Sequence, residues 1–346
     1  MKNSRLEITL DQTGLSLPDV GEIAVYRAKS SSDYGVFPKD RTILINSDRL
    51  QFDELEQQGY RVSEASQGPF SWSLVEITRS KSETLGLIAL AFAQSQPGGI
   101  VVVDGVKTDG IESVLKQCKG IFAVENTVAK SHGKLFWMIR PDTLPAQSQA
   151  WQKALVPVLN GDGFWTAAGM FSSEQIDKGS ALLAGHLDDR IKGAVADLGA
   201  GWGWLAAQAI KSDNLKTIDL FEAEKTALDA AKLNVADPRA QFHWSNVSTL
   251  ADAGQYDTVI CNPPFHQGRA AEPAIGIEFI RKAAQILKPN GSLWLVANRQ
   301  LPYEAALEQN FSHWKLLEQT NVFKAIHAVK PLSASARQRR ANAVKP

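Results

Sequence analysis

A short loop of one amide, two prolines and one aromatic residue carries the clearest chemistry in this sequence. It reads Asn262-Pro263-Pro264-Phe265 and follows an apolar run, residues 257–261, that predicts a buried strand. The exocyclic amine of a base or an amide is a poor nucleophile, because its lone pair is delocalised. Two acceptors, the side-chain oxygen of Asn262 and the carbonyl of Pro263, could bind both N–H groups of such an amine. The loop therefore indicates chemistry on a flat amine.

The rest of the loop fits this interpretation. Two adjacent prolines hold the backbone rigid, so the acceptors are preorganised. Phe265 offers a face on which a flipped or single-stranded base could stack. His266 is adjacent and is a candidate substrate contact at the rim or a proton acceptor, although the product ammonium loses its proton readily and requires no such base. Cys261, with no activating base evident nearby, is expected to pack in the core rather than attack a cytosine.

A glycine-rich turn lies upstream of this loop. Residues 194–198 predict a strand, and Gly199, Gly201 and Gly203 follow it before a predicted helix. Glycines at such a turn let a ligand lie against bare peptide groups. The third glycine position of the dinucleotide fingerprint holds Trp204, whose size disfavours NAD or FAD. The sequence contains no G-x-x-x-x-G-K-[ST] loop, which disfavours a nucleoside triphosphate.

Acidic residues flank the turn. Asp197 stands just before it, and Glu222 ends the next predicted strand, where a carboxylate can accept both hydroxyls of a ribose. This spacing is typical of S-adenosylmethionine binding, since acids suit the ribose and the cationic amino-acid end of that cofactor. Asn246, after the third strand, is a candidate for the adenine edge. Local helix capping is the alternative role for all three residues.

Strand and helix patterns alternate through the second half of the chain and end in a hairpin, which predicts a mostly parallel, doubly wound α/β sheet. The expected strands are 194–198, 217–221, 241–244, 257–261, 292–297, 315–320 and 322–328, and the expected helices are 204–210, 223–234, 277–287 and 303–310.

The first half carries a fainter copy, with strands expected at 72–77 and 100–104 and a helix at 84–94. When the first half is aligned with the second by a constant shift in residue number, one shift aligns Pro97 with Pro289. A shift that is eight residues shorter aligns Val75 with Val259. The first copy has no glycine-rich turn and no counterpart of the Asn262 loop. We therefore expect two tandem Rossmann-like domains, the N-terminal one degenerate, with chance similarity of two β-α-β units as the alternative.

Length and composition suit two soluble domains. The 346 residues support the division 1–145, a proline-containing linker over 146–163, a catalytic domain over 164–331 and a tail over 332–346. The two cysteines are far apart and lack metal-ligand neighbours, which argues against a disulfide scaffold or a zinc site and fits a cytoplasmic protein. The longest apolar run, near 85–93, is too short for a membrane span.

Net charge does not point to a nucleic acid, because 37 basic residues balance 37 acidic ones. One stretch, from residue 321 to the end, contains basic residues and no acidic one. This stretch is either a solvated tail or a phosphate-contacting one. Its basic residues are Lys324, Lys330, Arg337, Arg339, Arg340 and Lys345.

With these motifs in place, the sequence resembles the bacterial two-domain ribosomal RNA guanine-N2 methyltransferases of the small-subunit methyltransferase C type. The resemblance is strong over about 164–330 and looser before it. The segments that carry it are Gly169-Met170-Phe171-Ser172 with Asp177, Gly179 and Ser180, then 262–266, then 319–324, and more loosely 97–103 and 133–137.

The resemblance implies an S-adenosylmethionine-dependent enzyme that methylates the N2 amine of a guanine in small-subunit (16S) ribosomal RNA. It also implies that the segment containing Phe171 walls the cofactor pocket and that the first domain aids folding and RNA recognition. We expect a monomer with no membrane partner. Bulky Trp202 and Trp204 in the turn, and the basic tail, depart from the family pattern.

Other functions compete with this one. A glutamine amide of a release factor is methylated through a similar loop, although Phe265 and the duplicated first half favour RNA. Adenine N6 methylation of RNA or DNA fits the loop chemistry equally well. A non-catalytic RNA-binding assembly factor is the alternative outside enzymes, and the presence of Asp197, Glu222 and Asn262 argues against it.

Overall fold

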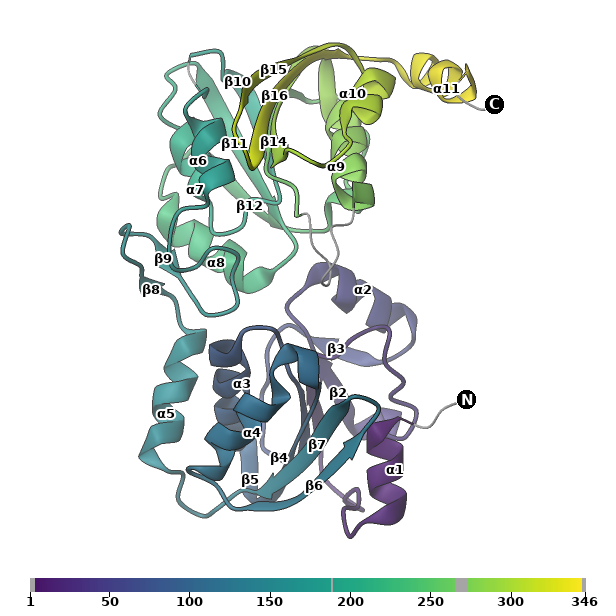
Figure 1. Ribbon diagram of the computed structural model, residues 1–346, viewed down its shortest axis with the longest axis vertical. Helices are drawn as coiled ribbons and strands as arrows, with labels where there is room; N and C mark the ends of the chain where they lie inside the picture. The colour runs from purple at the N-terminus through teal and green to yellow at the C-terminus, as the bar shows by residue number, and fades with distance from the viewer. Residues whose placement is uncertain (1–3, 188, 265–272, 344–346) are drawn as a thin grey trace. The chain divides into compact units, whose positions relative to one another are not determined.

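The computed structural model describes residues 4–187, 189–264 and 273–343, and the chain divides into two compact units. The first unit comprises Met1–Val158 with Ala167–Gly169, and the second comprises Leu159–Thr166 with Met170–Pro346. The first unit runs from purple to teal in Figure 1, and the second from teal to yellow. Within the described ranges, no helix is both long and apolar enough to cross a membrane.

A seven-stranded sheet forms the centre of the first unit. Its strands are β1 (Ile23–Tyr26), β2 (Thr42–Ile45), β3 (Arg61–Ser63), β4 (Phe70–Glu76), β5 (Ser95–Val106), β6 (Val124–Lys130) and β7 (Gly133–Ile139). Its helices are α1 (Arg5–Gln12), α2 (Arg49–Gln57), α3 (Lys81–Gln94), α4 (Ile111–Lys119) and α5 (Ala146–Gln152). The strand order is β3-β2-β1-β4-β5-β7-β6, with β7 and β6 antiparallel at the edge.

The second unit is built on another seven-stranded sheet. Its strands are β10 (Gly193–Leu198), β11 (Leu215–Glu222), β12 (Ala240–Trp244), β13 (Tyr256–Cys261), β14 (Leu287–Asn298), β15 (Phe311–Gln319) and β16 (Phe323–Pro331). Its helices are α6 (Lys178–Ala184), α7 (Trp204–Ala209), α8 (Lys225–Asn234), α9 (Pro273–Ile286), α10 (Glu304–Asn310) and α11 (Ala334–Ala343). The order β12-β11-β10-β13-β14-β16-β15 repeats that of the first sheet.

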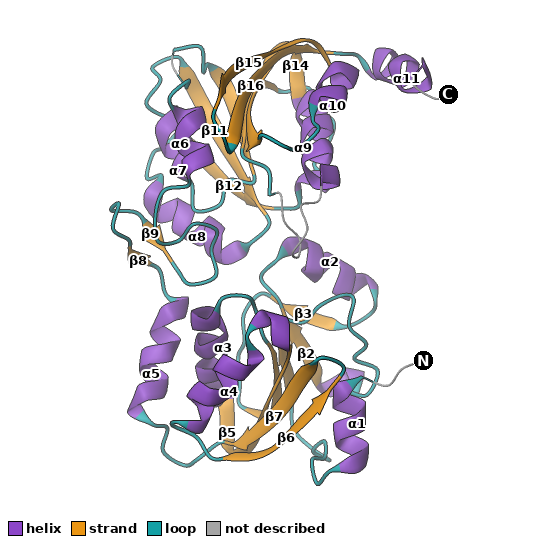
Figure 2. Ribbon diagram, viewed as in Figure 1, coloured by secondary structure: helices purple, strands orange, loops and turns teal. Residues whose placement is uncertain are grey.

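Each sheet is covered on both faces, as expected for parallel strands made of near-continuous apolar residues. In β10, Val195 packs into a core with α6, α7 and α8, whereas the next residue, Ala196, packs into a core with α9 and α10. Figure 2 shows these two groups of helices on opposite sides of the second sheet. The predicted fold of two tandem, mostly parallel α/β sheets is confirmed, with the predicted hairpin at the end of the second sheet. The first sheet also ends in a hairpin.

Because the two sheets share one strand order, their positions can be matched through the strand pairing. The shift in residue number that aligns Pro97 with Pro289 also aligns Val103 with Leu295. Val103 pairs with Val75 in the first sheet, and Leu295 pairs with Cys261 in the second. Val75 pairs in turn with Tyr26, and Cys261 with Leu198. Val75 therefore corresponds to Cys261, and the predicted match of Val75 to Val259 is wrong by two residues. Val259 and Cys261 pack into the same core, so a slip of two keeps the same face buried and leaves the apolar pattern unchanged.

The segment expected to join the domains contains regular structure. Helix α5 lies in it and packs against α3 of the first unit, and the two-residue strands β8 (Val158–Leu159) and β9 (Trp165–Thr166) follow. The linker over 146–163 stays a prediction.

The basic C-terminal segment is helical over α11, and two of its arginines donate to backbone carbonyls of neighbouring elements. The guanidinium of Arg337 donates to the carbonyl of Ala284 in α9 at 3.2 Å. Arg340 donates to the carbonyl of Phe311, after α10, at 3.3 Å. These two side chains are therefore partly engaged within the protein.

Lys324, counted among the basic residues of that stretch, is buried in β16. Its Nζ donates to the carbonyl of Leu301 at 2.7 Å and pairs with Glu304 at 2.5 Å, which lowers the pKa of the Glu304 carboxyl against the opposing effect of its partial burial. Lys324 is thus a structural ion-pair partner and not part of a basic surface.

Candidate active site

The glycine-rich turn connects the end of β10 to the start of α7. Gly199, Gly201 and Gly203 have φ values of 71°, 56° and 86°, a region that other residues rarely adopt. A side chain at Gly203 would crowd α8, whereas one at Gly201 would meet open space. Glycine is thus required for different reasons along the turn: helix packing at Gly203, and exposed backbone facing a cavity at Gly201.

Glu222 supports the turn from the end of β11. Its Oε2 accepts a hydrogen bond from the backbone N–H of Gly201 at 2.7 Å, and its Oε1 accepts one from Glu224 at 2.8 Å. A carboxylate oxygen can accept more than one hydrogen bond. The side chain therefore fixes the turn while keeping capacity for a further donor.

Asp197 is the most unusual ionisable group of the site. Its side chain is fully buried, and no hydrogen-bond partner meets either carboxylate oxygen among the described residues. Burial, and then the charge of Glu222, raise the pKa of Asp197 to about 8. A buried carboxylate without a partner is costly unless a cation or a proton accompanies it.

The loop after β13 brings Asn262 to the same edge of the sheet. The amide Nδ2 of Asn262 donates to Oδ2 of Asp177 at 3.0 Å and to Oγ of Ser180 at 2.8 Å. Pro263 is buried, and Pro264 lies 3.9 Å from where a side chain of Gly199 would begin. The proline loop and the glycine turn are therefore neighbours.

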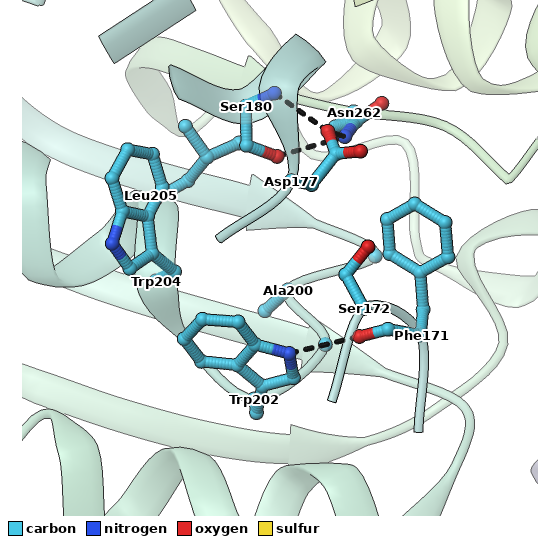
Figure 3. A pocket seen from close by; sticks show the side chains of 11 residues that line it. Phe171, Ser172, Asp177, Ser180, Ala200, Trp202, Trp204, Leu205 and Asn262 are labelled. Atoms are coloured by element: carbon cyan, nitrogen blue, oxygen red, sulfur yellow. Dashed lines mark hydrogen bonds between the residues drawn. The ribbon is translucent and has the colours of Figure 1, made fainter. Parts of the chain in front are cut away.

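A pocket of about 420 Å³, part of it open to solvent, lies where the loop and the turn meet (Figure 3). The pocket is lined by Phe171, Ser172, Asp177, Ser180, Gly199, Ala200, Gly201, Trp202, Trp204, Leu205 and Asn262.

The indole of Trp202 fixes one wall of this pocket. Its Nε1 donates to the carbonyl of Phe171 at 2.9 Å, and its ring packs against Phe164 with 5.3 Å between centroids. Ser172, next along the chain, has a φ of 49° that is uncommon outside glycine. The phenyl ring of Phe171 remains 57% exposed. Trp202 thus holds the backbone of a wall whose aromatic side chain stays accessible.

Helix α6 supplies the polar wall opposite. Asp177 is its N-cap, with Oδ2 accepting from the backbone N–H of Ser180 at 2.7 Å. A side chain at Gly179 would lie 3.0 Å from the ring of Phe323, so glycine allows α6 to approach β16 closely. This packing fixes the position of Asp177 and Ser180 relative to the loop that carries Asn262.

Four of the predicted site residues line the pocket together: Phe171, Gly199, Gly201 and Asn262. The others differ in where they lie. Asp197, Gly203 and Glu222 belong to the turn and its support, Pro263 and Pro264 to the adjacent loop. Asn246 lies after β12, where its side-chain oxygen accepts from the N–H of Ser248 at 3.1 Å. Phe265 and His266 lie outside the described residues.

Ser172, Asp177 and Ser180 belong to the segment that the resemblance implies walls the cofactor pocket, whereas four other lining residues were not predicted: Ala200, Trp202, Trp204 and Leu205. The sequence held signals for residues of both groups. Asp177 and Ser180 stand at the spacing of a helix N-cap and its partner, and the tryptophans were visible as unusually large residues in a glycine turn.

Cys261 is buried at the end of β13, as expected of a core residue. Burial, with a smaller contribution from Asp197, raises the pKa of its thiol well above the usual value. The thiolate needed for nucleophilic attack is therefore strongly disfavoured.

Known proteins share this architecture and sequence. Residues 162–327 match the methyltransferase small domain family. The ribosomal RNA small subunit methyltransferase C of Psychromonas ingrahamii is 30% identical over 269 residues, 75% of this chain and 76% of the relative. That of Haemophilus influenzae is 28% identical, over 73% and 77%. The structure of the T. thermophilus 16S rRNA N2 G1207 methyltransferase, in complex with AdoMet and guanosine, superposes with a TM-score of 0.75 at 21% identity, over 91% of this chain and 90% of that one. The chain belongs to the ribosomal RNA small subunit methyltransferase C family.

Proposed function

We propose that this chain transfers a methyl group from S-adenosylmethionine to the exocyclic N2 amine of a guanine in 16S ribosomal RNA. Its family membership supports the reaction class and the RNA. The T. thermophilus enzyme of the same fold was solved with AdoMet and guanosine, the cofactor and nucleoside that the proposal requires.

One observation carries the proposal. Asn262, the predicted amine acceptor, and Gly199 and Gly201, the predicted cofactor turn, line the same pocket (Figure 3). A methyl donor and an amine must approach each other directly for transfer, so their two binding elements must share one cavity.

The residues at the turn fit S-adenosylmethionine. The open space at Gly201 lets a ligand lie against the backbone, and the partnerless carboxylate of Asp197 suits the ammonium group of the cofactor. Glu222 ends β11 beside the turn, where its carboxylate would accept the ribose hydroxyls. Phe171 would contact the cofactor from the opposite wall, and Asn246 would bind the adenine edge through its amide nitrogen.

The chemistry follows from the acceptors of the loop. When bound, S-adenosylmethionine supplies an electrophilic methyl group. The Asn262 oxygen and the Pro263 carbonyl accept the two N–H groups of the guanine amine, and Pro264 keeps the loop stiff against the glycine turn. Phe265 and His266 would contact the base. The nitrogen held by these acceptors would take the methyl group as its carbon–sulfur bond breaks, leaving neutral S-adenosylhomocysteine, and the methylated amine would release one proton to water.

The test is direct. Purified protein is incubated with radiolabelled S-adenosylmethionine and either small ribosomal subunits or naked 16S rRNA from a strain lacking this methyltransferase. Nucleosides are then identified by mass spectrometry. We expect N2-methylguanosine at one position. Formation of N6-methyladenosine would contradict the proposal and support adenine methylation. Label in protein instead of RNA would contradict it and support methylation of a glutamine amide.

We further propose that the first unit has lost the cofactor site. The strand pairing matches its residues to those of the second unit. The matched pairs, first unit before second, are Val25 with Asp197, Arg27 with Gly199, Lys29 with Gly201, Asn46 with Glu222, and Glu76 with Asn262.

Charged side chains occupy the corresponding turn of the first unit. Arg27 keeps the positive φ of Gly199, at 54°, and its guanidinium pairs with Glu83. Lys29 pairs with Glu76 at 3.1 Å, and Glu76 also accepts from the hydroxyl of Tyr34. Isothermal titration calorimetry should therefore give one S-adenosylmethionine per chain, and Asp197→Ala should abolish all binding. A second site surviving that substitution would refute the proposal.

The remaining assignments complete the proposal. The first domain, 1–145, supports folding and RNA recognition, the catalytic domain spans 164–331, and the linker and tail lie at 146–163 and 332–346. The protein acts as a cytoplasmic monomer without a metal. Light scattering at micromolar concentration tests the monomer, and a filter-binding assay of residues 164–346 against the full chain tests the contribution of the first domain to RNA affinity.

A further inference from the structure

The catalytic amide of Asn262 is held by Asp177, the N-cap of α6, and by Ser180 in the first turn of that helix. Both contacts fall on its nitrogen: Nδ2 donates to Asp177 at 3.0 Å and to Ser180 at 2.8 Å. An amide nitrogen has two hydrogens, and both are used in this way. The oxygen Oδ1 therefore points away from α6, as Figure 3 shows.

We infer that Asp177 is a positioning residue that decides which end of the Asn262 amide faces the amine of the substrate. The inference rests on the proposed function. It assigns Asp177 no contact with the guanine and no proton transfer, only control of the amide through one hydrogen bond.

The physical reason is that a carboxylate accepts hydrogen bonds and cannot donate them. If the amide rotated by half a turn, Oδ1 would face the carboxylate of Asp177, and Nδ2 would face the substrate amine, donor against donor. Both contacts would be repulsive. Ser180 cannot make this choice alone, because a hydroxyl either donates or accepts.

The support for Asp177 is itself fixed by the fold. Its Oδ2 also accepts from the backbone N–H of Ser180 at 2.7 Å as the N-cap of α6. Gly179 lets this helix approach Phe323 of β16. One oxygen atom thus ties the start of the helix to the amide of Asn262, 85 residues away in the sequence.

Asp177→Asn is the sharpest probe, since Asn caps helices about as well as Asp while its amide can donate to Oδ1 of Asn262 and so permit the wrong orientation. In single-turnover assays on small ribosomal subunits, we expect a rate about 10- to 100-fold lower, with affinities for S-adenosylmethionine and RNA within about twofold of wild type. Ser180→Ala should cost less, since the carboxylate remains. Ser212→Ala is the matched control, because it removes a buried serine hydroxyl that donates to Ile191 at 2.7 Å, outside the pocket.

A double-mutant cycle separates positioning from a merely structural role. In an Asn262→Ala background there is no amide to orient, so Asp177→Asn should change the residual rate by less than about twofold. An equal loss in both backgrounds would overturn the inference. Exchanging the partners gives a second test: Asn262→Asp alone opposes two carboxylates, and adding Asp177→Asn restores a donor. We expect the exchanged pair to exceed Asn262→Asp by about tenfold or more, and no recovery would count against the role.

The wild-type assay keeps this inference separate from the proposed function. If wild-type protein forms no N2-methylguanosine, the proposed function fails. If wild type is active and the cycle is additive, the reaction stands and Asp177 has no positioning role.

Discussion

Glu222 accepts a hydrogen bond from the backbone amide of Gly201, with 2.7 Å between Oε2 and N. The residue proposed to bind the ribose is therefore also the support of the turn against which the cofactor is proposed to lie. The same carboxylate raises the pKa of Asp197, after burial. The proposed ribose contact, the hydrogen bond that supports the turn, and the raised pKa of Asp197 thus all involve the side chain of Glu222 at the end of β11.

Glu222→Gln should weaken S-adenosylmethionine binding more than it weakens the fold. The glutamine oxygen can still accept one backbone N–H, but the charge and one acceptor are lost. We expect an affinity about 10- to 100-fold lower by calorimetry, as for loss of a charged hydrogen-bond partner worth 1.5–3 kcal/mol. Glu224→Gln, two residues away, controls for charge and should bind the cofactor normally. Equal effects of the two changes would remove Glu222 from the site.

Cofactor affinity should depend on pH through Asp197. With a pKa near 8 the carboxyl is largely protonated at pH 6, so binding a cationic ammonium group requires release of its proton. Affinity should rise by up to about tenfold per pH unit between pH 6 and 8. Titrations in buffers of different ionisation enthalpy measure the released proton directly. Asp197→Asn should flatten the dependence, and a profile unchanged by that substitution would contradict the assignment.

The stability of the ligand-free protein should show the opposite trend. Between the ordinary pKa of 3.8 and the raised value near 8, the folded protein retains a proton on Asp197 that the unfolded chain has released. The free energy of unfolding therefore falls as pH rises through this window, by up to about 1.4 kcal/mol per unit from this group. Urea unfolding of wild type and Asp197→Asn from pH 5 to 8 isolates the contribution. Parallel curves for the two proteins would show that Asp197 titrates normally.

Trp202→Phe should loosen the wall of the pocket that carries Phe171. The change keeps the aromatic contact with Phe164 but leaves the Phe171 carbonyl without its indole donor. We expect the free energy of unfolding to fall by about 1 kcal/mol and S-adenosylmethionine binding to weaken severalfold. Trp294→Phe removes an indole hydrogen bond to Ser292 outside the pocket and is the control. Loss of stability without loss of affinity would make Trp202 a packing residue only.

The glycine turn and the Asn262 loop were predictable because their signals are local. A strand, a turn and a helix follow one another at Gly199, and Asn262 comes directly after a buried strand. Parallel strands then bring both to the same edge. The contact of Asn262 with Asp177 was not predictable in this way, because it depends on how α6 packs against the sheet. The same holds for Lys324, whose partner Glu304 is set by tertiary packing.

The match between the two halves shows a different limit. Both faces of β4 and β13 are buried, and residues two apart along a strand face the same core, so a slip of two residues was invisible in the sequence. Only the strand pairing places Arg27 on Gly199. That placement explains why no glycine pattern appears in the first half: an arginine with a positive φ makes the same turn.

The arginines of α11 should divide into structural and RNA-contacting ones. Arg337 donates to backbone carbonyls of Ala284 and Leu332, whereas Arg339 is exposed. Arg337→Gln should therefore lower thermal stability and leave the salt dependence of RNA binding nearly unchanged. Arg339→Gln should leave stability unchanged and reduce the slope of log affinity against log salt by about 0.7 to 0.9, the loss of one phosphate contact. Filter binding across a salt series measures the slope. If neither substitution alters it, the helix is a solvated end of the chain, and the electrostatic contact with RNA must come from another surface.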